Sequence, residues 1–158
     1  MQAFNRIRAF TLIEMLFVMA IICVLTAVAI PNLLETRKAV NERAAVSTMR
    51  DIVTAQEIFR NCRLGSSPGY GTLQDLASTP VGSVQLLRWP DPARVGYRNL
   101  YHFEQVEDPT KDNWCIRASP ETFGLTGDSY FAAVEDGIIR TGTSQPSSRA
   151  DVIAMKPI

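Results

Sequence analysis

The sequence is poor in the residues that carry most catalytic and metal chemistry. It has one histidine and three cysteines in 158 residues, and their spacing matches no metal-binding pattern. Neither a nucleophile–base set nor a phosphate-binding loop is recognisable. The formal net charge is zero, which gives no support to an extended basic surface for nucleic acid. We therefore predict no enzyme, cofactor, metal ion or specific nucleic-acid partner, and expect His102 to be a surface or packed residue.

A long apolar run near the amino terminus is the feature that stands out. Residues 10–30 form a stretch of 21 residues with one charge, Glu14. This length is sufficient to cross a bilayer as a helix. Arg6 and Arg8 precede the run and favour an amino terminus on the cytoplasmic side. Because a carboxylate in hydrocarbon costs roughly 2.5–3.5 kcal/mol, we expect Glu14 to have a role of its own.

Three interpretations of the apolar run compete. A secretory signal peptide would use Ala27-Val28-Ala29 as its small-x-small cleavage site, but Pro31 follows closely and Glu14 lies inside the stretch. A plain membrane anchor leaves the cost of Glu14 unexplained. The third interpretation gives the carboxylate a function and depends on the residues around it.

Residues 8–14, Arg-Ala-Phe-Thr-Leu-Ile-Glu, resemble the processing motif of type IV pilins and of the pseudopilins of type II secretion. The resemblance implies a leader of residues 1–9, cleavage between Ala9 and Phe10 by a prepilin peptidase, and N-methylation of Phe10. Glu14 occupies the position at which the family has a glutamate. Pro31 occupies a position at which many major pilins have a proline. The family strongly prefers glycine at the position of Ala9, so we expect slower processing here.

The physics of Glu14 fits this resemblance. Cleavage before Phe10 creates a positive amine one helical turn from the carboxylate, close enough for intramolecular compensation. In a filament the same carboxylate can instead meet the amine of a neighbouring subunit, where a low-dielectric surrounding strengthens the attraction. The family resemblance thus implies that Glu14 sets the register of assembly.

Pro31 has two interpretations. It lacks a backbone donor and crowds the preceding turn, which predicts a kink or a locally unwound stretch over residues 27–31. Alternatively, Pro31 begins a second helix. The resemblance favours one helix that continues through it.

The chain beyond Pro31 still has helical periodicity up to about Asn61. Residues on one expected face recur at spacings of four and three: Ala45, Met49, Ile52, Gln56 and Phe59. Polar residues occupy the other sides: Arg43, Ser47, Arg50, Thr54 and Glu57. We therefore predict a single helix that is transmembrane first and amphipathic afterwards.

The C-terminal part predicts strands over residues 96–106, 114–118, 129–134 and 138–141, with a tight turn at Glu135-Asp136-Gly137. Residues 65–71 are typical of a loop, and Thr72 is expected to cap a short helix over residues 73–77. We expect residues 79–92 to be irregular and residues 144–158 to form a loose tail. The predicted fold class is α+β, with the long N-terminal helix packed on a small antiparallel sheet. The predicted divisions are a leader (1–9), a transmembrane and polymerisation segment (10–31) and a globular domain (32–158).

The cysteines and loop aspartates are secondary candidates. We expect Cys23 to be a packed thiol, and predict a Cys62–Cys115 disulfide if the globular part is exported; the alternative is two separate buried thiols. Some major pseudopilins bind calcium in a C-terminal loop, but the segment after Asp108 departs from their pattern, so no metal site is predicted.

Together these features predict a structural subunit of a type IV pilus-like filament. The resemblance implies several partners: copies of the chain, prepilin peptidase, inner-membrane assembly machinery and other pilin-like subunits. It implies a single-pass precursor in a bacterial inner membrane and then a periplasmic or extracellular filament. Two alternatives remain: a type II secretion pseudopilin and a membrane-anchored periplasmic binding module.

Overall fold

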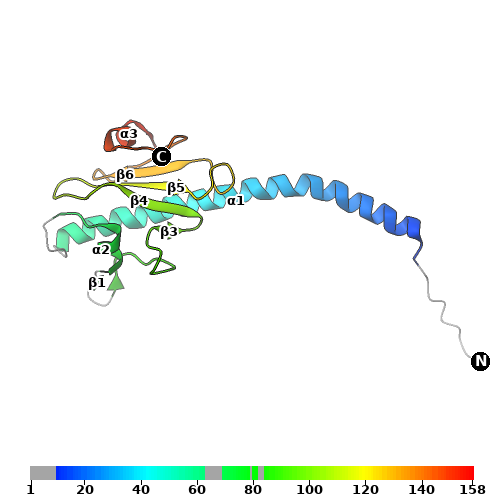
Figure 1. Ribbon diagram of the computed structural model, residues 1–158, viewed down its shortest axis with the longest axis horizontal. Helices are drawn as coiled ribbons and strands as arrows, with labels where there is room; N and C mark the ends of the chain where they lie inside the picture. Colours follow the sequence, from blue (N-terminus) through cyan, green and yellow to red (C-terminus); the bar gives the residue numbers. More distant parts are fainter. Residues whose placement is uncertain (1–9, 63–68, 79, 82–83) are drawn as a thin grey trace, which may run out of the picture. The chain divides into compact units, whose positions relative to one another are not determined.

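The computed structural model describes residues 10–62, 69–78, 80–81 and 84–158 (Figure 1). The predicted leader and most of the loop predicted over 65–71 lie outside these residues. The chain divides into two compact units whose boundary falls between Thr36 and Arg37. One helix, α1 (Leu12–Cys62), belongs to both units, and all other elements belong to the second.

The helix α1 is continuous through Pro31. The alternative in which this proline begins a second helix is therefore wrong. The backbone is helical at every position from 27 to 31, so the local unwinding predicted there is not seen in this structure.

The predicted amphipathic face of α1 is confirmed. Ala45, Met49, Ile52 and Gln56 have no exposed surface, and Phe59 is 3% exposed. The residues expected on the other sides are exposed, as the helical period requires. Two further buried residues of this face, Thr48 and Ala55, were not predicted.

The main sheet has six antiparallel strands in sequential order. Its members are β3 (Tyr97–Arg98), β4 (Tyr101–Glu107), β5 (Cys115–Pro120), β6 (Tyr130–Val134), β7 (Ile139–Gly142) and β8 (Lys156–Pro157). A separate pair, β1 (Pro80–Val81) and β2 (Val84–Gln85), lies in the segment predicted to be irregular. The predicted α+β class is confirmed, and β5, β6 and β7 lie within one or two residues of their predicted bounds.

Two segments differ from prediction. The strand predicted over 96–106 is a hairpin, because Asn99 and Leu100 take positive φ angles of 53° and 61° and reverse the chain between β3 and β4. The predicted loose tail instead contains α3 (Arg149–Ala154) and the strand β8. The helix α3 begins with a capping box between Ser148 and Asp151, a signal that the sequence prediction overlooked.

Two short local predictions are confirmed. Thr72 caps α2 (Leu73–Ser78), since its hydroxyl accepts a hydrogen bond from Asp75 N at 3.1 Å while the Asp75 carboxylate accepts from Thr72 N at 2.9 Å. The turn between β6 and β7 contains Gly137 at φ +72°, the positive angle that favours glycine.

The sheet buries both faces. Alternate residues of β5 and β6 pack with α1 on one face, among them Ile116, Phe131 and Ala133. The intervening residues Cys115 and Ala132 pack with Val152 of α3 on the other face. Figure 1 shows the second part of α1 and α3 on opposite sides of the strands.

The predicted Cys62–Cys115 disulfide is contradicted by the structure, in which both thiols are free. Cys62 is exposed at the end of α1, whereas Cys115 is buried on the α3 face of the sheet. The strand alternation therefore directs the Cys115 side chain away from α1. Burial also raises the pKa of the Cys115 thiol to about 11, which disfavours the reactive thiolate. Cys23, expected to be packed, is exposed in the single chain.

Candidate assembly site on the first helix

The start of α1 is defined by Thr11. Its hydroxyl accepts a hydrogen bond from Glu14 N at 3.3 Å, and its carbonyl accepts from Met15 N at 3.3 Å. Thr11 and Glu14 have the spacing of a capping box, a signal that was missed in the sequence. Phe10 precedes the helix and is 70% exposed. Ala9, the other residue of the predicted cleavage site, lies outside the described residues.

Glu14 lies in the first turn of α1 and is exposed. A carboxylate at this position interacts favourably with the positive end of the helix dipole. Within the described part of the chain Glu14 forms no ion pair. It is therefore available to a cation that another molecule or a processed amino terminus supplies.

The apolar side chains of the first unit are unburied. Every large apolar residue from Phe10 to Leu34 is at least 41% exposed. The segment is long and apolar enough to cross a membrane. Its Thr26 hydroxyl donates to the carbonyl of Ile22 at 2.9 Å, so this polar group needs no water. An apolar surface of this extent requires lipid or other protein to cover it.

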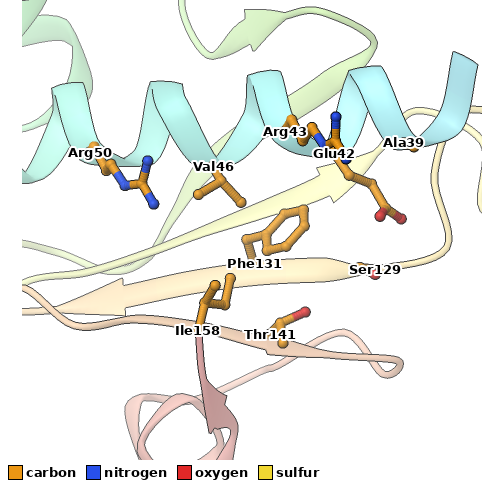
Figure 2. Close-up of a pocket in the computed structure, with 9 residues that line it drawn as sticks. All are labelled: Ala39, Glu42, Arg43, Val46, Arg50, Ser129, Phe131, Thr141 and Ile158. Carbon is orange, nitrogen blue, oxygen red and sulfur yellow. The ribbon is translucent and has the colours of Figure 1, made fainter.

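A groove of about 580 Å³ lies in the second unit between α1 and strands β6 and β7 (Figure 2). Its large apolar lining residues are Val46 of α1 and, opposite it, Phe131 and Ile158, and the charged residues Glu42, Arg43 and Arg50 of α1 line it as well. None of its lining residues is a histidine, cysteine or lysine. The groove thus supplies apolar contacts, two guanidinium groups, the Glu42 carboxylate and the hydroxyls of Ser129 and Thr141.

Three further polar residues, His102, Asp128 and Asp136, have structural partners. His102 stacks on Tyr97 with ring centroids 4.3 Å apart. Asp128 pairs with Lys38, and Asp136 pairs with Arg140 at 2.5 Å. Within residues 10–62, 69–78, 80–81 and 84–158, no group of three His, Cys, Asp or Glu side chains is placed to hold a metal ion.

Comparison with known proteins finds one matching motif and several similar chains. Residues 4–30 match the prokaryotic N-terminal methylation motif. The chain is 29% identical over 145 residues to the type IV wide pilus major component PilA4 of Thermus thermophilus, an alignment that covers 91% of this chain and 95% of PilA4. It is 35% identical over 54 residues to the competence protein ComGC of Streptococcus pneumoniae, covering 34% of this chain and 50% of ComGC. No solved structure matches the chain.

The motif, the exposed apolar helix that carries it and the similarity along nearly the whole chain define a pilin-like protein. The chain carries the prokaryotic N-terminal methylation motif and is similar to a type IV pilin along nearly its whole length. The resemblance inferred from residues 8–14 is therefore confirmed.

Proposed function

We propose that the chain is a non-catalytic structural subunit of a type IV pilus and polymerises through α1. The observation that carries the proposal is the exposed apolar surface of residues 10–34, most of which lies within the methylation motif of residues 4–30. In the precursor the bilayer covers this surface. In the filament, the corresponding helices of other copies cover it.

Processing prepares the subunit for assembly. Prepilin peptidase removes residues 1–9 at the cytoplasmic face of the inner membrane, and the new amine on Phe10 is methylated. Phe10 and Thr11 precede the helix, so the new amine is not part of the helical hydrogen-bond pattern. Residues 10–31 then form the polymerisation segment, and residues 32–158 form the globular domain on the outer side of the membrane.

Glu14 specifies the register of assembly. In the membrane-bound subunit its carboxylate compensates the amine of its own Phe10, one helical turn away. In the filament it pairs with the amine of a neighbouring copy, and burial between helices makes an unpaired partner costly. A copy docked out of register leaves a buried charge alone, so the paired register is selected.

Pro31 provides a weak point in the same helix. The carbonyl of Ala27 has no donor at position 31, because proline lacks the N–H that would complete this turn. The structure keeps the turn helical, and we propose that filament packing opens it. The inner-membrane assembly machinery would act on this segment when it withdraws the subunit from the bilayer.

A pseudopilin of a type II secretion system is the alternative that shares the same motif. The extent of similarity favours a pilus: PilA4 aligns with 91% of the chain, whereas the alignment with ComGC stops after 54 residues. Deletion of the chain in its host distinguishes the two. A pilus subunit should be needed for surface fibres and dispensable for protein secretion.

The experiment that tests the proposal is intact-mass measurement of the membrane-extracted protein, together with imaging of purified fibres. We expect a chain that begins at Phe10 and carries one added methyl group, and fibres that an antibody to this chain labels. A mature chain that begins at Met1 or at Ile30 would contradict the proposal.

A further inference from the structure

The loop that joins β5 to β6, residues 121–129, presents two large apolar side chains to solvent. Phe123 is 52% exposed and Leu125 is 59% exposed. The Phe123 ring stacks on that of Tyr130, with centroids 5.5 Å apart. Gly124 between them has φ +81° and open space around it. The loop therefore holds the apolar pair Phe123 and Leu125 at its tip, and the stack on Tyr130 already orients the Phe123 ring.

The 121–129 loop is held by its own hydrogen bonds. Thr126 N and Leu125 N both donate to the carbonyl of Thr122, at 2.9 and 3.1 Å. Thr122 N donates to the Thr126 hydroxyl at 3.1 Å, and Gly124 N donates to Gly127 O at 3.0 Å. The loop thus loses little conformational freedom when a partner binds.

The same loop is fastened to α1. Asn41 donates to the carbonyl of Thr126 at 2.9 Å, Asp128 N donates to the Glu42 carboxylate at 2.8 Å, and Lys38 pairs with Asp128 at 3.2 Å. The three helix residues lie on one side of α1, since they are three and four positions apart. The loop that carries the exposed apolar pair is therefore fixed to residues 38–42 of α1, which follow the proposed polymerisation segment of residues 10–31 in the sequence.

The side chain that packs beneath the loop, Tyr101, is buried. The Tyr101 side chain is 1% exposed, and its hydroxyl donates to the carbonyl of Ser129 at 2.9 Å. Burial raises the pKa of Tyr101, and the carboxylates of Glu42 and Asp128 raise it further, so the hydroxyl stays protonated and remains a donor. Phe123 and Leu125 are therefore exposed on a loop that the Tyr101 hydrogen bond holds in place.

We propose that the 121–129 loop of one copy docks into the groove between α1 and β7 of a second copy, and that this contact joins globular domains in the filament. The inference rests on the proposed function as a filament subunit. The groove has large apolar lining residues, Val46, Phe131 and Ile158, that match the apolar pair of the loop. Ser129 at the end of the loop lines the groove, but Phe123 and Leu125 at its tip do not. A contact between the tip of one copy and the groove of another therefore joins copies head to tail, which extends a helical polymer where the ring does not close.

Charge complementarity supports a second copy as the occupant. The loop contains Glu121 and Asp128 and no lysine or arginine, while the groove is lined by two arginines, Arg43 and Arg50, and one carboxylate, Glu42. Opposite charges at the rim of an interface fix its register and orientation. A membrane surface is a poorer match, because anionic lipids attract basic segments rather than acidic ones.

The test places a photo-crosslinking amino acid at position 123 in the full chain, with position 153 as the matched control. Ile153 is similarly exposed, at 49%, but lies on α3. In purified filaments we expect position 123 to crosslink to residues 39–50 or to β6 of a second copy, and position 153 not to do so. Subunits dispersed in detergent should give neither product.

Substitutions provide an independent measurement. Phe123→Ser with Leu125→Ser should leave the melting temperature of dispersed subunits unchanged, because both side chains are exposed. Subunit release from sheared filaments should rise about tenfold, because a buried apolar pair is lost. Arg50→Glu should raise release as well, and adding Glu121→Arg should lower it again.

Several outcomes would overturn the inference. Normal filaments in which position 123 crosslinks only to lipid, to another protein or to nothing would remove the contact while leaving the proposed function intact. A closed dimer in detergent that crosslinks through the same residues would replace the head-to-tail contact with a two-fold pair. Failure of the unsubstituted mature chain to form filaments would instead overturn the proposed function itself.

Discussion

The two units of the chain use the same helix in opposite ways. In the first unit the large apolar side chains of α1 are exposed, and Ile30 is 57% exposed. In the second unit one face of α1 is buried, and Ile52 has no exposed surface. The apolar partner of the second part is the sheet of the same chain. The partner of the first part must come from outside the chain.

This difference separates stability from assembly. Burial of an apolar side chain contributes about 1.5–3 kcal/mol when its surface leaves water on folding. The second unit gains that contribution within one chain. The first unit can gain it only from a partner outside the chain, which we propose to be lipid and then other copies. Substitutions there are therefore expected to change assembly and to leave folding unaffected.

The largest effect is expected for Glu14→Ala. We expect about a hundredfold less incorporation into filaments, since removal of one partner of a buried ion pair costs roughly 3–5 kcal/mol. The melting temperature of the dispersed subunit should not change. Glu35→Ala is the matched control, because Glu35 is another exposed carboxylate of α1 in the first unit. Normal fibre yield with Glu14→Ala would remove the register function.

The next effect compares one substitution in both units. Ile52→Ala should lower the free energy of unfolding by about 2–5 kcal/mol, because Ile52 has no exposed surface. Ile30→Ala should leave it nearly unchanged. Urea unfolding in detergent, followed by the fluorescence of the buried Trp89 and Trp114, measures both. Equal losses in the two variants would contradict the division between the units.

Gln56 tests how a polar residue on the buried face of α1 contributes to the stability of the second unit. Its side-chain nitrogen donates to Gly71 O at 2.7 Å, and its oxygen accepts from Gly71 N at 3.0 Å. Gln56→Leu leaves both backbone groups buried and unpaired, so we expect a loss of about 2–4 kcal/mol in the free energy of unfolding. Gln74→Leu on the exposed side of α2 is the control. A neutral Gln56→Leu variant would show that water reaches Gly71.

Periodicity explains which parts of the fold were predictable. The spacing of Met49, Ile52 and Phe59 identified the buried face of α1, because a helix turns by a constant angle per residue. The hairpin at Asn99 and Leu100 was missed, because neither residue is a glycine and their positive φ angles depend on the surrounding sheet. The β8 strand was missed for a related reason: it is two residues long and exists only through its pairing with β7.

The candidate site likewise combines features that a local sequence pattern predicts with features that depend on the surrounding fold. Phe10 and Glu14 belong to a short linear motif, which can be found from spacing along the chain and which the comparison matches over residues 4–30. Their roles in processing and assembly stay predictions. The disulfide prediction was wrong because the face to which Cys115 points depends on strand register, which composition does not specify. The groove and the 121–129 loop bring together residues far apart in the sequence, so only the three-dimensional fold brings them into view.

The smallest effect tests how the turn after β6 supports the second unit at low pH. The hydrogen bond from Arg140 lowers the pKa of Asp136 below its ordinary value of 3.8. Because the pKa is lower in the folded state, the pair stabilises the fold above pH 3.8 and loses this contribution as the pH falls through the lowered value. Asp136 is partly exposed, so solvent screening limits the contribution to about 0.5–1 kcal/mol. Asp136→Asn should lower the melting temperature slightly at pH 7, and the difference from the unsubstituted chain should shrink as the pH falls below 3.8. A difference that stays constant across this range would show that the turn geometry, rather than the charge of Asp136, stabilises this end of the sheet.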